Sequence, residues 1–151
     1  MTLRLPRAAA GAVEEHAAEA YPEESCGLLL GPVGTDFASP GRAAAVDETR
    51  RLANAWGEGP RSNRYEVSPA ALAAVERELR GTGRGVLGFY HSHPDAPAWP
   101  SPFDLARAWP CYSYLIVSVS KDGARGRRSW VRTDDGESFV EEPIELVESG
   151  S

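Results

Sequence analysis

The sequence predicts a single α/β (α+β) domain in which helices flank a mixed central β-sheet. Two helical patterns occur beside several short apolar runs typical of strands, and the helices and strands do not alternate strictly along the chain. A length of 151 residues suits one domain with one core. We therefore expect residues 1–151 to form one domain, with its core over about residues 5–142 and a short C-terminal tail.

The N-terminal half is expected to begin with a helix from Pro6 to about Ala20. A proline suits the first helical turn, and small apolar residues follow on one face until Pro22 ends the helix. The apolar run Cys26–Leu30, which lies between two prolines, indicates a buried central strand. The remaining elements expected in this half are strands over 42–46 and 50–55 and a loop over 57–63.

A second helix is expected after Ser68, which is a good N-cap and is followed by Pro69 at the first helical position. Gly81 ends this helix, and Val86–His93 is expected to be a strand. The other expected elements are a short strand over 65–67, an irregular proline-rich stretch over 94–102, a short helix over 103–109, a buried strand over 113–120, a turn over 121–123 and a hairpin of 126–133 with 138–142.

Composition limits the classes of partner. The net charge of −6 argues against nucleic acid or an anionic membrane as the main partner, because both require a basic face.

Cys26 and Cys111 are too few for a disulfide framework and lack CxxC spacing, so we expect two reduced thiols. Glu14 and Glu15 interrupt the N-terminal apolar run too early for a signal peptide, and no segment is long enough for a membrane span. A cytoplasmic protein is expected.

The segment from residue 90 to 104 carries the strongest chemical signal. Side chains two apart on a strand face the same way, so His91 and His93 would project together and could share one metal ion. The proline-rich loop turns the chain, and Asp104 can then supply a third ligand. Two histidines and one carboxylate with a fourth position open are typical of a catalytic zinc site. The alternatives are a histidine pair on an ordinary strand surface and an Asp104 that only completes a capping box with Ser101.

A hydrolytic zinc site also needs a general base. Glu23 and Glu24 lie just before the apolar strand, where a carboxylate can stand at the end of a buried element. The competing interpretation is that both are solvated charges at a helix end.

These motifs together resemble the signature of the JAMM (MPN+) zinc metallopeptidases. The run His91-Ser92-His93-Pro94, five further residues, Pro100-Ser101, two more and Asp104 matches it at every position. Upstream, residues 24–31 (ESCGLLLG) resemble the strand that carries the catalytic glutamate of this family. Asn54-Ala55, Tyr65 and the Ser68-Pro69 helix are similar to its compact bacterial branch, which includes CysO-cysteine peptidases. The resemblance covers about residues 22–120.

The resemblance implies a JAB/MPN domain of cytidine-deaminase-like fold that holds one Zn²⁺ per chain through His91, His93 and Asp104. It implies that Glu24, which directly precedes the Ser-Cys-Gly triplet, is the base that takes a proton from water and passes it to the leaving amine. It further implies that Ser101 helps to stabilise the tetrahedral intermediate, although the capping role competes for the same hydroxyl. The remaining histidine, His16, is assigned no role.

The resemblance also implies hydrolysis of an amide or isopeptide bond at the Gly-Gly tail of a ubiquitin-like or sulfur-carrier protein. Trp99 could line the cleft for that tail or could pack structurally. One rival is a non-catalytic interaction module of the same fold, but such modules typically lose the metal ligands that are present here. A zinc deaminase is a second rival, and it fails because residue 93 is His where Glu is needed and residue 114 is Tyr where Cys is needed. The sequence indicates no oligomeric state.

Overall fold

The structure is a computed structural model, and it describes residues 1–148. These residues form, in chain order, β1 (Thr2–Pro6), α1 (Arg7–Ala20), β2 (Cys26–Pro32), β3 (Ala43–Ala45), β4 (Glu48–Leu52), α2 (Pro69–Leu79), β5 (Arg84–Pro94), α3 (Pro102–Arg107), β6 (Ser113–Ser120), β7 (Gly123–Arg132), β8 (Phe139–Glu142) and β9 (Ile144–Val147).

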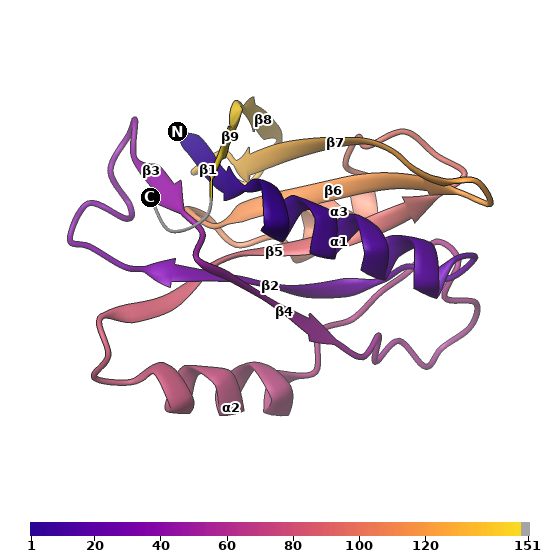
Figure 1. Cartoon of the computed structure of the whole chain (residues 1–151), viewed down its shortest axis with the longest axis horizontal. Coiled ribbons are helices and arrows are strands. Elements are labelled where there is room, and N and C mark those ends of the chain that lie inside the picture. Colours follow the sequence, from indigo (N-terminus) through magenta and orange to yellow (C-terminus); the bar gives the residue numbers. More distant parts are fainter. Residues whose placement is uncertain (149–151) are drawn as a thin grey trace.

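A mixed six-stranded sheet forms the centre of the molecule, in the order β4-β2-β5-β6-β7-β8 (Figure 1). Neighbouring strands are antiparallel except for β5 and β6, which are parallel. The three inner strands β2, β5 and β6 are buried almost throughout, which explains their continuous apolar sequences. His91 lies on one of these inner strands, between Cys26 of β2 and Ile116 of β6.

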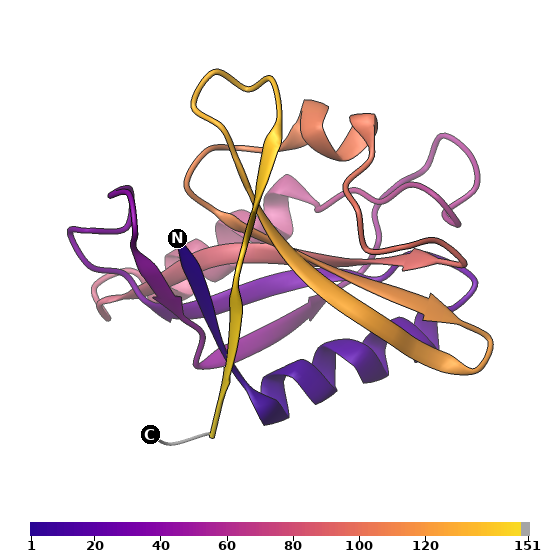
Figure 2. The same cartoon turned by 90° about the horizontal axis from the view of Figure 1, so that it is seen from above.

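Helices cover both faces of this sheet, with α1 on one face and α2 and α3 on the other (Figure 2). The core is divided accordingly. One cluster packs α1 against Tyr90 and other strand residues, and the second packs α2 against Phe89 and its neighbours. Because side chains alternate along a strand, Tyr90 faces α1, and His91 faces the side of α2 and α3. Tyr90 and His91 therefore point to opposite faces of the sheet, and the His91 ring stacks on Tyr65, on the side away from α1.

A second sheet of three parallel strands, in the order β3-β1-β9, lies at one end of the molecule. Leu3 and Leu5 of β1 are fully buried and pack in the cluster that includes Ile144 and Leu146. The sequence did not indicate β1 or β9. In particular, residues 144–147 were expected in a C-terminal tail, but they pair with β1 because the chain brings its two ends side by side.

The other expected elements agree with the structure within a few residues, with one exception. Residues 65–67 are not a strand. The backbone N–H of Glu66 donates to the side-chain oxygen of Asn54, and its carbonyl accepts from Ala55. The Asn54 side chain therefore accepts a hydrogen bond that the backbone of a neighbouring strand would accept in a sheet. The prediction of a strand over residues 65–67 was wrong.

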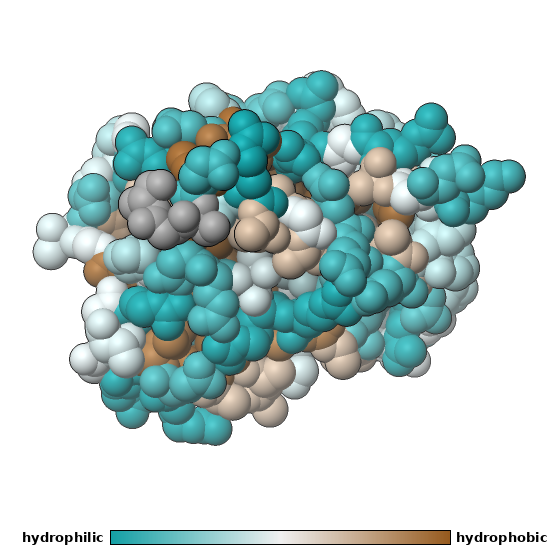
Figure 3. All heavy atoms as spheres, viewed as in Figure 1, coloured by the Kyte–Doolittle hydropathy of each residue, from teal (hydrophilic) through white to brown (hydrophobic). Residues whose placement is uncertain are grey.

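The surface over α1 is mostly hydrophilic, and hydrophobic residues show only in small separate areas (Figure 3). Within residues 1–148, none of the helices has both the length and the apolar composition needed to cross a bilayer.

Candidate metal centre

The end of β5 and the start of α3 bring two histidines and an aspartate together. The Nε2 atoms of His91 and His93 lie 3.1 Å apart. The Oδ2 atom of Asp104 lies 3.3 Å from the first of these nitrogens and 3.1 Å from the second. All three side chains are buried. Ligands about 2.0–2.1 Å from a tetrahedral zinc ion are about 3.3 Å from each other, so this triangle has the size of one face of a zinc coordination shell.

The hydrogen bonds of the histidines favour metal binding through Nε2. The Nδ1 atom of His93 lies 2.9 Å from the carbonyl oxygen of Pro97, and since a carbonyl only accepts, Nδ1 carries a proton. Nε2 is then the ring atom that faces Asp104, and although burial lowers the pKa of His93, the hydrogen bonds to Asp104 and Pro97 and the charge of Asp104 raise it above its usual value. Burial lowers the pKa of His91, which keeps this imidazole neutral. The His91 ring stacks on Tyr65 with centroids 4.3 Å apart, and this contact fixes the plane of the ring.

Asp104 is oriented by a capping box at the N-terminus of α3. The N–H of Ser101 donates to Oδ2 of Asp104 (2.9 Å), and the N–H of Asp104 donates to Oγ of Ser101 (3.0 Å). Burial alone would raise the pKa of Asp104, but the two imidazoles and the Ser101 N–H hold it well below its usual range, so the carboxylate is ionised. In this cap the Ser101 hydroxyl acts as an acceptor and its hydrogen is left for another partner. The two roles considered for Ser101 are therefore compatible.

Glu24 lies two residues before the start of β2 and beside the two histidines. It is 5% exposed, and within residues 1–148 its Oε1 atom has no hydrogen-bond partner. Three potential ligand atoms lie within 4.8 Å of one another, one each from Glu24, His91 and His93. The triangle that includes Asp104 has sides of 3.1–3.3 Å, which is the separation expected between ligands of one zinc ion, so Asp104 is suited to complete the ligand set. Burial, partly opposed by His93, raises the pKa of Glu24 to about 8.

Two polar residues that the sequence analysis left without a role position Glu24. Ser92, the residue between the histidines, accepts hydrogen bonds through Oγ from the backbone N–H of Ser25 (2.8 Å) and from its hydroxyl (3.0 Å). The side-chain amide of Asn54 donates to the carbonyls of Glu24 (3.1 Å) and Arg64 (3.0 Å). The only sequence signal for Ser92 was a small polar residue in an otherwise buried strand.

A cluster of aromatic and cationic side chains connects the loop before α2 to α3. Trp56 and Phe103 pack edge to face with centroids 5.4 Å apart. The guanidinium carbons of Arg64 and Arg107 lie 4.4 and 4.6 Å from the centre of the Phe103 ring. Beside this cluster is a mainly apolar groove of about 310 Å³, lined by Tyr65, Glu66, Val67, Pro69, Leu72, Phe89, Arg107, Trp109 and Tyr114. Because Tyr65 also stacks on His91, the groove begins next to the candidate metal centre.

Trp99 does not line this groove. It is 54% exposed, packs against Trp130 with ring centroids 4.9 Å apart, and borders a separate hollow beside β7. The remaining histidine, His16, lies 2.7 Å from the hydroxyl of Tyr90 and therefore has a structural partner on the opposite face of the sheet. Cys26 and Cys111 are free thiols, as expected. Burial raises the pKa of Cys26 to about 12, which makes this thiol unreactive.

Comparison with known proteins identifies related sequences. A family model described as prokaryotic homologs of the JAB domain matches residues 6–133. The chain is similar to a desampylase of Haloferax volcanii, with 34% identity over 128 residues that cover 84% of this chain and 81% of the relative. It is also similar to the CysO-cysteine peptidase of Mycobacterium tuberculosis, with 30% identity over 138 residues that cover 91% and 86%.

Solved structures share the fold. A solution structure of a protein from Desulfitobacterium hafniense superposes with a TM-score of 0.79 and is 30% identical, covering 97% of this chain and 94% of that one. The crystal structure of a JAB1/MPN domain protein from Archaeoglobus fulgidus superposes with a TM-score of 0.52 at 19% identity, covering 95% and 96%. At this lower identity the likeness concerns the fold alone.

Proposed function

Because this chain belongs to the prokaryotic JAB-domain family, we propose that it is a zinc metallopeptidase that hydrolyses an amide or isopeptide bond at the Gly-Gly tail of a ubiquitin-like sulfur-carrier protein. In this proposal His91, His93 and Asp104 hold the metal, Glu24 is the general base and Ser101 assists at the oxyanion. The enzyme class is supported by the names of the relatives, which denote peptidases.

The observation that carries the proposal is the combination of a closed ligand triangle and an unpartnered carboxylate beside it. Two imidazole Nε2 atoms and one ionised carboxylate are a donor set that fits zinc, and the 3.1–3.3 Å separations fit its size. Glu24 adds a buried carboxylate oxygen without a partner. Buried polar atoms are rarely left unpaired unless a ligand or water completes them, so Glu24 is suited to accept a proton from water in the site.

When bound, zinc would supply Lewis acidity that lowers the pKa of water toward neutrality and polarises the scissile carbonyl. In this proposal Glu24 takes the proton from the attacking water, which is supported by a carboxylate oxygen of Glu24 that lies within 4.8 Å of a ring nitrogen of each histidine. It then holds that proton and transfers it to the nitrogen of the leaving amine. The Ser101 hydroxyl, whose oxygen accepts from the Asp104 N–H, still has a hydrogen that can be donated to a developing oxyanion.

The substrate class is supported by the relatives. One is named as the peptidase of a CysO-cysteine substrate and the other as a desampylase. In this chain, the groove of about 310 Å³ beside Tyr65 gives an extended tail an apolar surface next to the centre. A tail that ends in two glycines has no side chains to obstruct a narrow approach to buried histidines.

The test incubates the zinc-loaded protein with sulfur-carrier proteins that bear C-terminal extensions, and mass spectrometry locates the cut. We expect cleavage directly after the Gly-Gly pair and about one zinc per chain by elemental analysis. Glu24→Gln is expected to keep its zinc and lose about 100- to 10,000-fold in turnover, as for removal of a general acid–base. Glu24→Gln that cuts as fast as the parent would contradict the assigned base, and a parent protein without zinc uptake would contradict the metal centre.

A further inference from the structure

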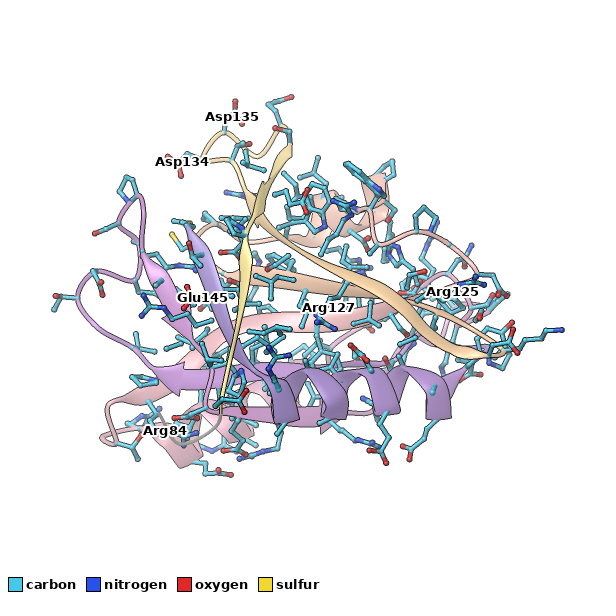
Figure 4. All side chains as sticks on the ribbon, turned by 45° about the horizontal axis from the view of Figure 1, so that its top comes forward. Arg84, Arg125, Arg127, Asp134, Asp135 and Glu145 are labelled. Atoms are coloured by element: carbon cyan, nitrogen blue, oxygen red, sulfur yellow. The ribbon has the colours of Figure 1, made fainter. Side chains whose placement is uncertain are left out.

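The arginines of this chain differ in whether a carboxylate neutralises them. Arg127 extends from β7 toward α1 (Figure 4), where its guanidinium pairs with Glu14. Arg84 pairs with Asp47 and Glu48, and Arg107 pairs with Glu66. Arg64 forms no ion pair within residues 1–148, and its one side-chain hydrogen bond goes to the carbonyl of its neighbour Asn63. Its donors on the other side of the guanidinium are therefore left for a ligand.

The fold holds Arg64 beside the candidate metal centre. The Asn54 amide donates to the carbonyls of both Arg64 and Glu24, so one side chain ties the two backbones together. The next residue, Tyr65, stacks on His91 at 4.3 Å. The Arg64 guanidinium rests 4.4 Å from the ring centre of Phe103, the residue before Asp104.

The proposed reaction fixes which part of a substrate lies near Arg64. Glu24 transfers its proton to the leaving amine, so the residue after the scissile bond lies on the Glu24 side of the centre. In an amino acid the α-carboxylate carbon is only two bonds from that nitrogen, and one residue spans at most about 3.6 Å. A lysine side chain released from an isopeptide has no free carboxylate at this distance. A cation beside Glu24 is therefore suited to the carboxylate of a single C-terminal residue.

Building on the proposed function, we propose that Arg64 binds the α-carboxylate of the leaving residue when a single amino acid follows the Gly-Gly pair. Hydrolysis of that peptide bond consumes one water, whose oxygen joins the glycine carboxyl group, and the amine leaves with the added proton as a free amino acid. Guanidinium and carboxylate form paired charge-assisted hydrogen bonds, which gives this contact specificity as well as strength.

The test measures binding rather than turnover. Fluorescent peptides that end in Gly-Gly-Xaa are prepared as the free acid and as the C-terminal amide, and they are titrated into zinc-loaded Glu24→Gln protein. We expect the acid to bind about tenfold more tightly than the amide, the size of one charge-assisted contact at a partly exposed site. In Glu24→Gln/Arg64→Gln this preference is expected to fall below about twofold, with zinc content and thermal unfolding unchanged. A peptide extended by two residues, whose carboxylate lies one residue farther on, is expected to show no such preference.

Glu24→Gln/Arg128→Gln is the matched control, because Arg128 also rests on an aromatic ring, that of Trp99, but is already paired with Glu141 and borders the separate hollow beside β7. It is expected to retain the preference for the acid. Equal binding of acid and amide by the Glu24→Gln protein would overturn the proposal, and so would a preference that survives Arg64→Gln, since the carboxylate would then be bound by zinc.

Cleavage of the same peptides by the parent protein separates this proposal from the proposed function. If Arg64→Gln loses the preference for the acid, the carboxylate site is supported even when the parent protein cuts neither peptide. Absence of cleavage by the parent would count against the proposed hydrolysis and not against the carboxylate site. Cleavage of acid and amide with the same kcat/KM would overturn the role of Arg64 and leave the peptidase activity in place.

Discussion

Two clusters of buried polar side chains in this molecule differ in how completely their hydrogen bonds are satisfied. In the first, Arg42 donates to Glu142, Ser113 and two backbone carbonyls, and Ser129 donates to the second oxygen of Glu142. Among the buried side-chain atoms of this cluster in residues 1–148, the Nε atom of Arg42 is the one that lacks a partner. In the second cluster, the candidate metal centre, Oε1 of Glu24 and Nδ1 of His91 have no partner, and three potential ligand atoms face one another.

This difference distinguishes a hydrogen-bond network that stabilises the fold from a cluster that is suited to bind a ligand or to react. A buried ion pair is tolerated when nearly all of its donors and acceptors are matched within the protein, as around Arg42. A buried carboxylate without a partner costs folding free energy, and it is retained where a ligand or a reaction uses it. The two clusters should therefore respond in opposite ways to mutation, one in stability and the other in metal binding and turnover.

The largest effect is expected from loss of a proposed ligand. His93→Ala removes one corner of the 3.1–3.3 Å triangle, and we expect zinc affinity to fall by more than about 100-fold, because even changes to residues that only support ligands cost 10- to 100-fold. Competition with a chromophoric chelator measures the affinity. Arg42→Met is the control in the other cluster, and an equal loss of zinc affinity in that variant would show that the two clusters are coupled.

Arg42→Met is expected to have the largest effect on stability. It leaves Glu142, whose side chain is 2% exposed, without its cation. Removal of one partner of a buried pair typically costs about 3–5 kcal/mol. Urea unfolding of the zinc-free protein gives the free energy of unfolding directly. Replacing both partners, as in Arg42→Met/Glu142→Leu, should recover much of the loss, and a double variant no better than the single one would argue against an unpaired charge as the cause.

Glu24 should make the zinc-free protein less stable as pH rises. Its pKa is about 8 in the folded chain against an ordinary 4.5, so between these values the folded state binds a proton that the unfolded state has released. The free energy of unfolding therefore falls between about pH 4.5 and 8. Glu24→Gln has no such proton, and above pH 8 it should exceed the parent by several kcal/mol, since each unit of pKa difference corresponds to about 1.4 kcal/mol. The measurement is urea unfolding across this range, and parallel curves for the two proteins would refute the prediction.

The smallest effects are expected from replacing two serines, one from each cluster. Ser92→Ala removes both hydrogen bonds that Ser25 makes to the serine oxygen and loosens the position of Glu24, so kcat should fall about tenfold with KM and zinc affinity unchanged. Ser129→Ala removes a donor to Glu142 and should cost about 1–2 kcal/mol of stability without changing kcat. Steady-state kinetics and unfolding of both variants decide this, and equal kcat values for Ser92→Ala and the parent would exclude a positioning role.

The sequence by itself determined the features that depend on local spacing. His91 and His93 share a face because side chains repeat every two residues along a strand, and Asp104 is oriented by a cap whose two partners are only three positions apart. The helices α1 and α2 and the inner strands were likewise predictable from their periodicity and their flanking prolines. The candidate ligand set could be predicted from the sequence because its geometry depends largely on residues that lie close together along the chain.

Tertiary structure alone decided which distant segments support these residues. No local pattern relates Ser92 to Ser25, Asn54 to Glu24 or Arg64 to the centre, since each contact crosses between elements. For the same reason β1 and β9 were not foreseen. Strands of four or five residues carry little periodic signal, and β9 pairs with residues about 140 positions earlier in the chain. Chain topology, which spacing does not encode, sets these contacts and therefore the surroundings in which the ligand set acts.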